Sequence, residues 1–356
     1  MLPPLDLPAH DAVALARCGQ GALSIDVLGA PGEDNAVLAT LDSGQRITRH
    51  LFDCGAGCLD GVRFRDLQQI DALYFSHFHM DHISGFDAFV RANYAREQVV
   101  RLHGPAGSHA VLQHRLQGYL WDLVEGTPGR FQVTEIRRGE LDTIELRSHE
   151  GFAVAHRVGT RPFDGRVHED EDCTIDAAIL DHGPSDSIGY VLRQKERRNI
   201  DARRLASAGL KPGPWLKRLL DPATPDDEPL QPGGSTTLGA ARSMFVVATP
   251  DESLGYLTDF RATPASLPEL RRLFSGCRWL VCENNYGDAD HETAIRNNHM
   301  TSSMVGELAS ALEPECLVVF HLTDKHGVEG WRTQLAQVRA RFPRAWYPPG
   351  WGSVFA

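Results

Sequence analysis

The sequence feature that most limits how this chain can fold is a group of four ionisable side chains directly after an apolar run. Residues 71–75 read DALYF, and residues 76–82 read SHFHMDH, which contains the pattern His-x-His-x-Asp-His. Two histidines two positions apart at the end of a strand point to the same side, and the turn that follows brings the next two side chains to a neighbouring point. Imidazole nitrogens and carboxylates are donors that zinc and similar ions prefer. The pattern therefore predicts a site for two divalent metal ions that contains His77, His79, Asp81 and His82.

Apolar strand-like runs alternate with amphipathic helix-like runs along most of the chain. The strand-like runs come in batches, which favours an α/β layered fold with mixed sheets over a doubly wound parallel sheet. The predicted strands lie at 22–30, 36–42, 49–55, 71–77, 99–105, 174–182, 187–193, 254–260, 278–284 and 316–322. The predicted helices lie at 84–97, 108–125, 266–275, 301–312 and 329–341.

Three polar residues end apolar runs later in the chain and are candidate partners for the first four ligands. His182 ends TIDAAILDH, Asp259 ends LGYLTD, and His321 ends CLVVFH. Each would be delivered by a buried strand to the rim of a sheet. A carboxylate has two oxygens and can span two ions, so Asp259 is the natural bridging ligand.

Together these motifs resemble the metallo-β-lactamase superfamily, and more closely its ribonuclease Z branch, the tRNA 3′-processing endonucleases. The resemblance covers nearly the whole chain, from about residue 22 to about residue 350. It implies a metallo-β-lactamase αβ/βα sandwich, in which two mixed β-sheets are flanked by helices. The matching segments are LFDCGAG (51–57), HFHMDHISGFDAF (77–89), DHGPSDSIGY (181–190), YLTDF (256–260), LVCEN (280–284), NHMTSS (298–303) and VVFHLTDK (318–325).

The resemblance also implies how the site residues divide their work. One metal takes His77, His79 and His182, the other takes Asp81, His82 and His321, and Asp259 bridges them. The remaining roles concern residues beside the metals: Asp53 supports the metal histidines, Asp81 accepts a proton from the nucleophile, His299 is the general acid, and Glu283 orients His299.

The chemistry expected of such a site is hydrolysis of a phosphodiester by a water that two divalent cations activate. Zinc suits the imidazole-rich donor set, while manganese or iron could use the same ligands. The other histidines are expected to be structural. His103 is one of them, and His50 and His168 match no motif.

A basic segment interrupts an otherwise acidic chain. Nine basic residues and two acidic residues stand between Arg193 and Arg218, and a Pro/Gly/Asp-rich stretch follows at 221–235. We predict a single domain over residues 1–356 with an arm and loop inserted at about 193–240. In the ribonuclease Z branch an arm at this place grips RNA, so the candidate phosphate-binding residues are Arg197, Arg198, Arg203, Arg204, Lys211, Lys217 and Arg218.

Other features point away from tRNA. The formal net charge is −11, and an acidic protein is a poor general nucleic-acid binder. Glu33 and Asp34 stand where the family has basic residues, and Cys282 and Lys325 replace an expected histidine and arginine. Three classes therefore stay open: an RNA endonuclease, a hydrolase of small phosphodiesters or sulfate esters, and a binding protein that keeps the fold without catalysis.

Cellular location and assembly follow from weaker signals. The N-terminus lacks the basic and apolar regions of a signal peptide, and no run approaches the roughly 18 apolar residues of a membrane span. Seven scattered cysteines without CxxC spacing favour a reduced, cytoplasmic protein. The resemblance implies a homodimer, with RNA or a small phosphodiester as the substrate and no membrane partner.

Overall fold

The computed structural model describes residues 22–43, 46–195, 198–221, 223–230, 235–248 and 252–355. The chain forms two compact units. The first, which we call the body, comprises Met1–Gln194 and Glu252–Ala356, and the second, which we call the arm, comprises Lys195–Asp251.

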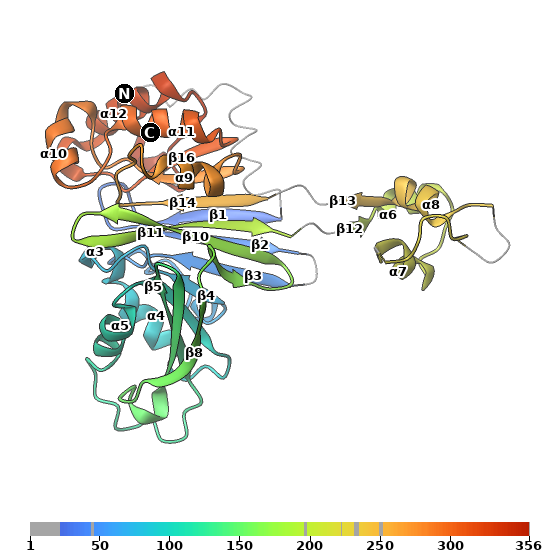
Figure 1. The fold of residues 1–356 in the computed structure, drawn as a ribbon, viewed down its shortest axis with the longest axis horizontal. Helices are drawn as coiled ribbons and strands as arrows, with labels where there is room; N and C mark the ends of the chain where they lie inside the picture. Colours follow the sequence, from blue (N-terminus) through green and yellow to red (C-terminus); the bar gives the residue numbers. More distant parts are fainter. Residues whose placement is uncertain are drawn as a thin grey trace. The chain divides into compact units, whose positions relative to one another are not determined.

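The first sheet of the body has eight strands that follow one another in chain order (Figure 1). Its two outer parts are antiparallel, whereas β3 to β6 are parallel and therefore need crossover connections through helices. The strands are β1 (Leu23–Leu28), β2 (Ala36–Asp42), β3 (Ile47–Phe52), β4 (Ala72–Tyr74), β5 (Val100–Pro105), β6 (Arg130–Arg137), β7 (Glu140–Arg147) and β8 (His156–Pro162).

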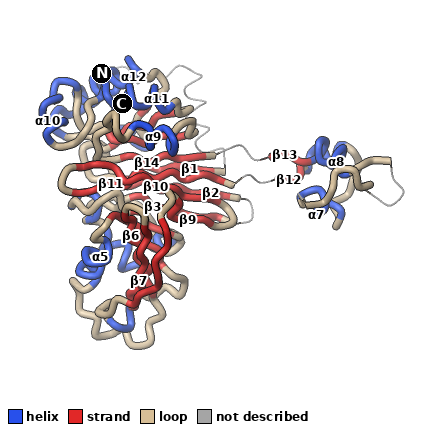
Figure 2. The backbone as a smooth tube through the Cα atoms, viewed as in Figure 1, coloured by secondary structure: helices blue, strands red, loops and turns tan. Residues whose placement is uncertain are grey.

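The second sheet has seven strands in the order β17-β16-β15-β14-β11-β10-β9. Figure 2 labels β14, β11, β10 and β9 of this sheet. Strands β14 to β17 are parallel, and β10 runs in the same direction as β14 because both are antiparallel to β11. The strands are β9 (Arg166–Glu169), β10 (Cys173–His182), β11 (Ser185–Gln194), β14 (Ser253–Leu257), β15 (Trp279–Glu283), β16 (Cys316–Phe320) and β17 (Ala345–Trp346).

Helices cover the outer face of each sheet. Apolar residues of β3 to β6 pack with α4 and α5 in one buried cluster, whereas a larger cluster joins the facing sides of the two sheets to α9, α11 and α12. This helix–sheet–sheet–helix order confirms the predicted metallo-β-lactamase αβ/βα sandwich. The helices are α2 (Phe64–Leu67), α3 (Met80–Ile83), α4 (Phe86–Asn93), α5 (Ser108–Leu116), α9 (Leu267–Phe274), α10 (His291–Arg296), α11 (Ser302–Leu312), α12 (Gly327–Arg341) and α13 (Gly352–Phe355).

The arm has a small apolar core of its own. Leu205, Leu219, Leu238 and Phe245 are buried together in it. Two short antiparallel strands form its base and three helices build the rest, with Asp201 capping the first helix. These elements are β12 (Arg198–Ile200), α6 (Ala202–Ser207), α7 (Trp215–Leu220), α8 (Leu238–Phe245) and β13 (Val246–Ala248).

Two expectations about local structure were wrong. The helix predicted at 108–125 ends at Leu116, where the Trp121 indole donates a hydrogen bond to the Leu116 carbonyl and the chain turns through Gly118. The arm continues past 240 through α8 and β13. Within the described ranges, no helix is long and apolar enough to cross a membrane.

Candidate metal centre

Strand β4 delivers the first group of histidines and the aspartate to one edge of the body. The strand ends at Tyr74, and the chain passes through buried Phe75, Ser76 and His77 before α3 begins at Met80. His79 precedes this short helix, while Asp81 and His82 lie within it. The turn predicted from the sequence is therefore one turn of helix, which places His82 back beside His77 with 4.3 Å between their ring centroids.

Three strands of the second sheet deliver the remaining candidate ligands to the same edge. His182 is the last residue of β10, Asp259 lies two residues beyond β14, and His321 directly follows β16. These strands run in one direction, so their carboxyl ends lie together. The fold therefore brings residues far apart in sequence to one place.

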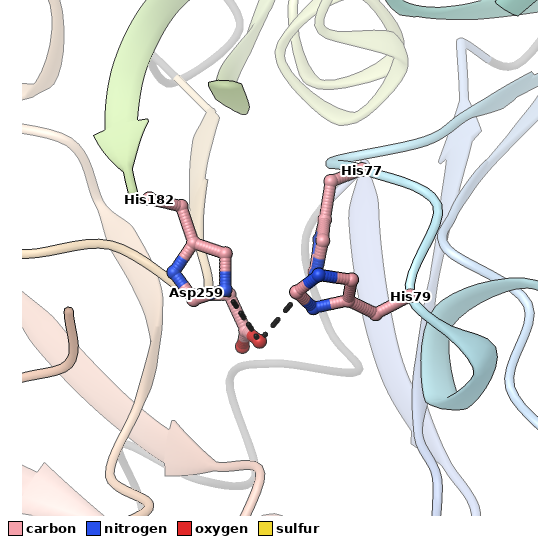
Figure 3. A group of neighbouring side chains, drawn as sticks. All are labelled: His77, His79, His182 and Asp259. Carbon is pink, nitrogen blue, oxygen red and sulfur yellow. Dashed lines mark ion pairs between the residues drawn. The ribbon is translucent and has the colours of Figure 1, made fainter. Parts of the chain in front are cut away.

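Asp259 lies at the centre of this group. Its Oδ2 atom is 3.6 Å from His77 Nε2, 3.8 Å from His182 Nε2 and 3.4 Å from His82 Nε2. Figure 3 shows His77 and His79 facing His182 and Asp259 from the opposite sheet. The donor atoms of His77, His79, His182 and Asp259 all lie within 4.8 Å of one another.

A second group shares Asp259 with the first. Asp81 Oδ2 lies 3.3 Å from both His82 Nε2 and His321 Nε2, and His321 Nδ1 lies 3.2 Å from the other oxygen of Asp259. The donor atoms of Asp81, His82, Asp259 and His321 again lie within 4.8 Å of one another. The structure thus brings together all seven candidate ligands in two groups joined by one carboxylate.

The spacing and the hydrogen bonding of these atoms fit divalent cations. Two ligand atoms of one tetrahedral ion, each about 2.1 Å from it, are separated by roughly 3.4 Å. Among the described residues, His77 Nε2 and His82 Nε2 are buried and form no hydrogen bond, although buried polar atoms are nearly always satisfied. The fold and this His/Asp cluster therefore indicate divalent metal binding.

The pKa values of the site residues also indicate that the buried carboxylates need positive charge beside them. Burial lowers the pKa of His321, but the carboxylates of Asp259, Asp81 and Glu283 together outweigh burial and raise this pKa to about 10. Burial raises the pKa of Asp259, yet His321 and His82 hold it well below its usual range. The buried carboxylates require cations beside them, which protonated imidazoles or divalent metals supply.

Asp53 lies at the base of the site and is fully buried. Its Oδ2 atom is 2.8 Å from His82 Nδ1, so the carboxylate orients that ring with Nε2 toward Asp259. The same oxygen accepts hydrogen bonds from the hydroxyls of Ser76 and Tyr256. Sequence reasoning overlooked both hydroxyls, although Ser76 directly precedes the histidine motif and Tyr256 lies three residues before Asp259.

Glu283 and His299 form a buried pair beside the metal ligands. Glu283 is the last residue of β15, between the strands that carry Asp259 and His321, and its Oε2 atom is 2.5 Å from His299 Nδ1. The opposite nitrogen of His299 lies 4.0 Å from Asp259 Oδ2. Burial lowers the pKa of His299, but the carboxylates of Glu283 and Asp259 together outweigh burial, so the net pKa is above the ordinary value.

Three site residues adopt left-handed backbone conformations, with φ of 56° at Asp53, 47° at Asp259 and 53° at His321. Such conformations are uncommon for residues other than glycine and cluster at functional sites. Each of these residues follows a buried strand that turns sharply at its end. The turn directs the side chain toward the sheet edge, where it stays buried at Asp53 and Asp259.

The predicted RNA-binding residues lie in the arm. Arg198, Arg203, Lys211 and Lys217 are exposed, and so is Arg204 even though it pairs with Asp201. Arg218 is half-buried and pairs with Glu228. The seventh candidate, Arg197, lies outside the described residues.

Two residues that replace basic family positions have local partners. Asp34 Oδ2 accepts a hydrogen bond from the Ala56 backbone amide at 2.8 Å, which ties its loop to the turn after Asp53. Lys325 Nζ lies 2.6 Å from Asp290 Oδ1 at the surface. Both side chains therefore have structural contacts that the sequence did not reveal.

Comparison with known proteins places the fold in a class. Residues 48–200 match the family model described as a β-lactamase superfamily domain. The crystal structure of the metallo-β-lactamase fold protein YhfI from Bacillus subtilis is similar, with a TM-score of 0.52, 15% identity, and 91% of this chain and 94% of that chain covered.

Two sequence relatives define the family more narrowly. Ribonuclease Z of Deinococcus radiodurans is 38% identical, with 92% of this chain and 98% of the relative covered. Ribonuclease Z of Myxococcus xanthus is 27% identical, with 81% and 83% covered. The chain belongs to the ribonuclease Z family, as its motifs predicted.

Proposed function

We propose that this protein is a two-metal phosphodiesterase that hydrolyses RNA, with the 3′ trailer of tRNA precursors as its substrate. The observation that carries the proposal is the position of Asp259, whose carboxylate joins two groups of donor atoms while the Glu283–His299 pair lies beside it. Membership of the ribonuclease Z family supports RNA as the substrate.

The two groups divide the cations as the sequence motifs imply. His77, His79 and His182 would hold one ion, Asp81, His82 and His321 would hold the other, and Asp259 would bridge them. Zinc is the proposed metal because imidazole nitrogens dominate the donor set. When bound, two such ions lower the pKa of water and neutralise charge on phosphoryl oxygens.

Side chains beside the proposed metal ligands would orient the histidine rings and transfer protons. Asp53 fixes the ring of His82 through Nδ1. Asp81 is the proposed proton acceptor, because its side chain is 41% exposed while the other carboxylate at the centre is buried. Glu283 holds the His299 ring and favours its protonated form, so His299 Nε2 can donate a proton to the leaving oxygen.

Substrate choice is assigned to the arm. Its exposed cations, Arg198, Arg203, Arg204, Lys211 and Lys217, would contact phosphates that lie away from the cleaved bond. Arg218 contributes less because Glu228 already neutralises it. We propose the same division of the chain as the sequence suggests, a single catalytic domain with one inserted RNA-binding arm.

The decisive experiment compares substrates on the metal-loaded full-length chain. A tRNA precursor with a 3′ trailer, bis(4-nitrophenyl) phosphate and cyclic AMP are assayed in parallel, with metal content per chain measured on the same sample. We expect cleavage of the precursor and of the chromogenic diester, and loss of both after chelation. Hydrolysis of the small diesters without any cleavage of RNA would instead assign the protein to the small-ester hydrolases.

Location and assembly stay predictions that follow from the proposed function. The six described cysteines are buried, and the predicted reducing, cytoplasmic environment rests on their scattered spacing. The homodimer implied by the family resemblance is tested by analytical ultracentrifugation of the full-length chain.

A further inference from the structure

A second group of metal-binding side chains lies between the two sheets of the body. His168 on β9 pairs in register with Ile175 on β10, and Cys173 begins β10, so Asp170 in the intervening turn lies beside both. The donor atoms of His168, Asp170 and Cys173 all lie within 4.8 Å of one another. The catalytic centre uses the opposite end of β10, since His182 is nine residues, or about 30 Å along the strand, from Cys173.

The first sheet places a fourth imidazole beside Cys173, although His50 is not within 4.8 Å of all three donors of this group. His50, on β3, is fully buried, and its Nε2 atom lies 3.5 Å from Cys173 Sγ. On the other side of the group, His168 Nε2 lies 3.4 Å from Asp170 Oδ2. Both separations are those of two ligand atoms bound to one tetrahedral ion, which are roughly 3.3–3.7 Å apart for nitrogen, oxygen and sulfur ligands.

The remaining contacts leave these four donor atoms available. Asp170 Oδ1 accepts hydrogen bonds from the backbone amides of Asp172 and Cys173, so its Oδ2 faces the group. His50 Nδ1 lies 3.4 Å from the Tyr74 hydroxyl, an arrangement that leaves Nε2 as the free lone pair when Nδ1 carries the proton. Among the described residues, His168 Nε2 is buried without a hydrogen-bond partner.

The charges also suit a divalent cation. The neutral form of the His50 imidazole can coordinate a metal ion. A carboxylate from Asp170 and a thiolate from Cys173 would together neutralise a dication in a buried position. Sulfur and imidazole donors in a closed set of four are typical of a structural zinc site.

We propose that His168, Asp170 and Cys173 form a second, structural site for zinc, and that the His50 ring turns toward them to complete it when zinc binds, which links β3 of the first sheet to β9 and β10 of the second. The site is separate from the catalytic centre and contributes to stability instead of hydrolysis. Binding there would stabilise the folded chain in proportion to the free zinc concentration.

The test uses the full-length chain reconstituted with Zn²⁺ or Co²⁺ and freed of excess metal. Cys173→Ala should lose about one metal equivalent per chain relative to the unaltered protein, and its melting temperature should fall. Its turnover of bis(4-nitrophenyl) phosphate should stay within about twofold, because Cys173 does not touch the catalytic group. Cys277→Ala is the matched control, since Cys277 is equally buried and belongs to none of the donor groups in the described chain.

Cobalt gives a signal specific to this site. Within the described part of the chain, no cysteine belongs to the donor groups around Asp259, so a sulfur-to-cobalt charge-transfer band reports on Cys173. The band should be present in the unaltered protein and absent in Cys173→Ala. Asp170→Asn is the second variant, because its amide oxygen can accept the same two backbone hydrogen bonds while losing the charge; it should weaken zinc retention. An unaltered protein without the band, and a metal content equal in all variants, would overturn the proposal.

Discussion

The body and the arm differ in how their candidate functional side chains are placed. In the body, the candidate ligands are mostly buried, and seven of them converge from the ends of strands on two sheets. In the arm, a small apolar core supports cations that are largely exposed to solvent. Under the proposed function, bond cleavage would depend on rigid, desolvated geometry, whereas substrate choice would depend on a charged surface whose contacts are individually weak.

The largest effect should come from the carboxylate that both groups share. Asp259→Asn keeps the side-chain size but removes the charge, so we expect loss of bound metal and a fall in kcat/KM of about 10³-fold or more on every substrate. Asp290→Asn, which alters a carboxylate paired with Lys325, is the control and should keep full metal content. Retained activity of Asp259→Asn on small diesters would break the assignment of chemistry to the body.

Removing the proposed acid should leave the metals in place. His299→Ala should lower turnover by about 10²–10⁴-fold with unchanged metal content, because only proton donation to the leaving group is lost. His291→Ala, which alters an exposed histidine of α10, is the matched control. Unchanged turnover in fully loaded His299→Ala protein would remove this residue from the mechanism.

Deleting the arm separates the two regions directly. Arg193 and Ser253 pair on antiparallel neighbours β11 and β14, and the Gln194 amide donates to the Glu252 carbonyl at 2.9 Å, so Asn-Gly can join Gln194 to Glu252 as a hairpin turn. We expect RNA cleavage to fall by about 10²-fold while turnover of bis(4-nitrophenyl) phosphate changes little. Equal losses on both substrates would show that the arm serves the chemistry as well.

The pH profile sharpens the role of the buried pair. Burial lowers the pKa of His299, and the carboxylates of Glu283 and Asp259 together more than offset this effect. A general acid acts while protonated, so activity should decline as pH rises through the pKa of His299. Glu283→Gln removes the carboxylate charge and should move that decline to lower pH, as measured by kcat from pH 5 to 10 on metal-loaded protein. A profile that does not move would leave Glu283 with a packing role only.

Single cations of the arm should give the smallest effects. Lys217→Gln should weaken RNA binding a few-fold and reduce the salt dependence of binding by roughly one phosphate contact. Glu228→Gln is a useful counterpart, since it frees Arg218 and should strengthen binding at low salt. RNA binding that is unchanged in both variants would argue against the arm as the phosphate-binding surface.

The candidate ligands could be predicted from the sequence because most of them follow the end of an apolar strand, while Asp81 and His82 lie in the short helix just beyond one. A histidine or aspartate directly after an apolar run can be placed without knowing the rest of the fold, as His182 and His321 show. The hydroxyls of Ser76 and Tyr256 could not be assigned, because their common partner Asp53 is brought to them only by the packing of two sheets.

The group around Cys173 could not be predicted from the sequence for the same physical reason. Its members His50 and His168 lie on strands of different sheets, and nothing in their local sequence marks a metal site. The end of α5 was predicted wrongly. The helix-like sequence pattern continues beyond Leu116, but the helix ends there, and the Trp121 indole donates a hydrogen bond to the Leu116 carbonyl. Periodicity reports the buried face of an element, but it does not report where a tertiary contact stops that element.

The place where the arm joins the body has an evolutionary consequence. Its two ends emerge from paired positions on adjacent antiparallel strands, where a two-residue turn would otherwise suffice. An insertion at such a point leaves the sheet register and the catalytic edge untouched. Lineages could therefore gain, lose or exchange this segment in one step. Under the proposed function, a grafted arm from a relative should change which nucleic acid is bound without redesign of the body.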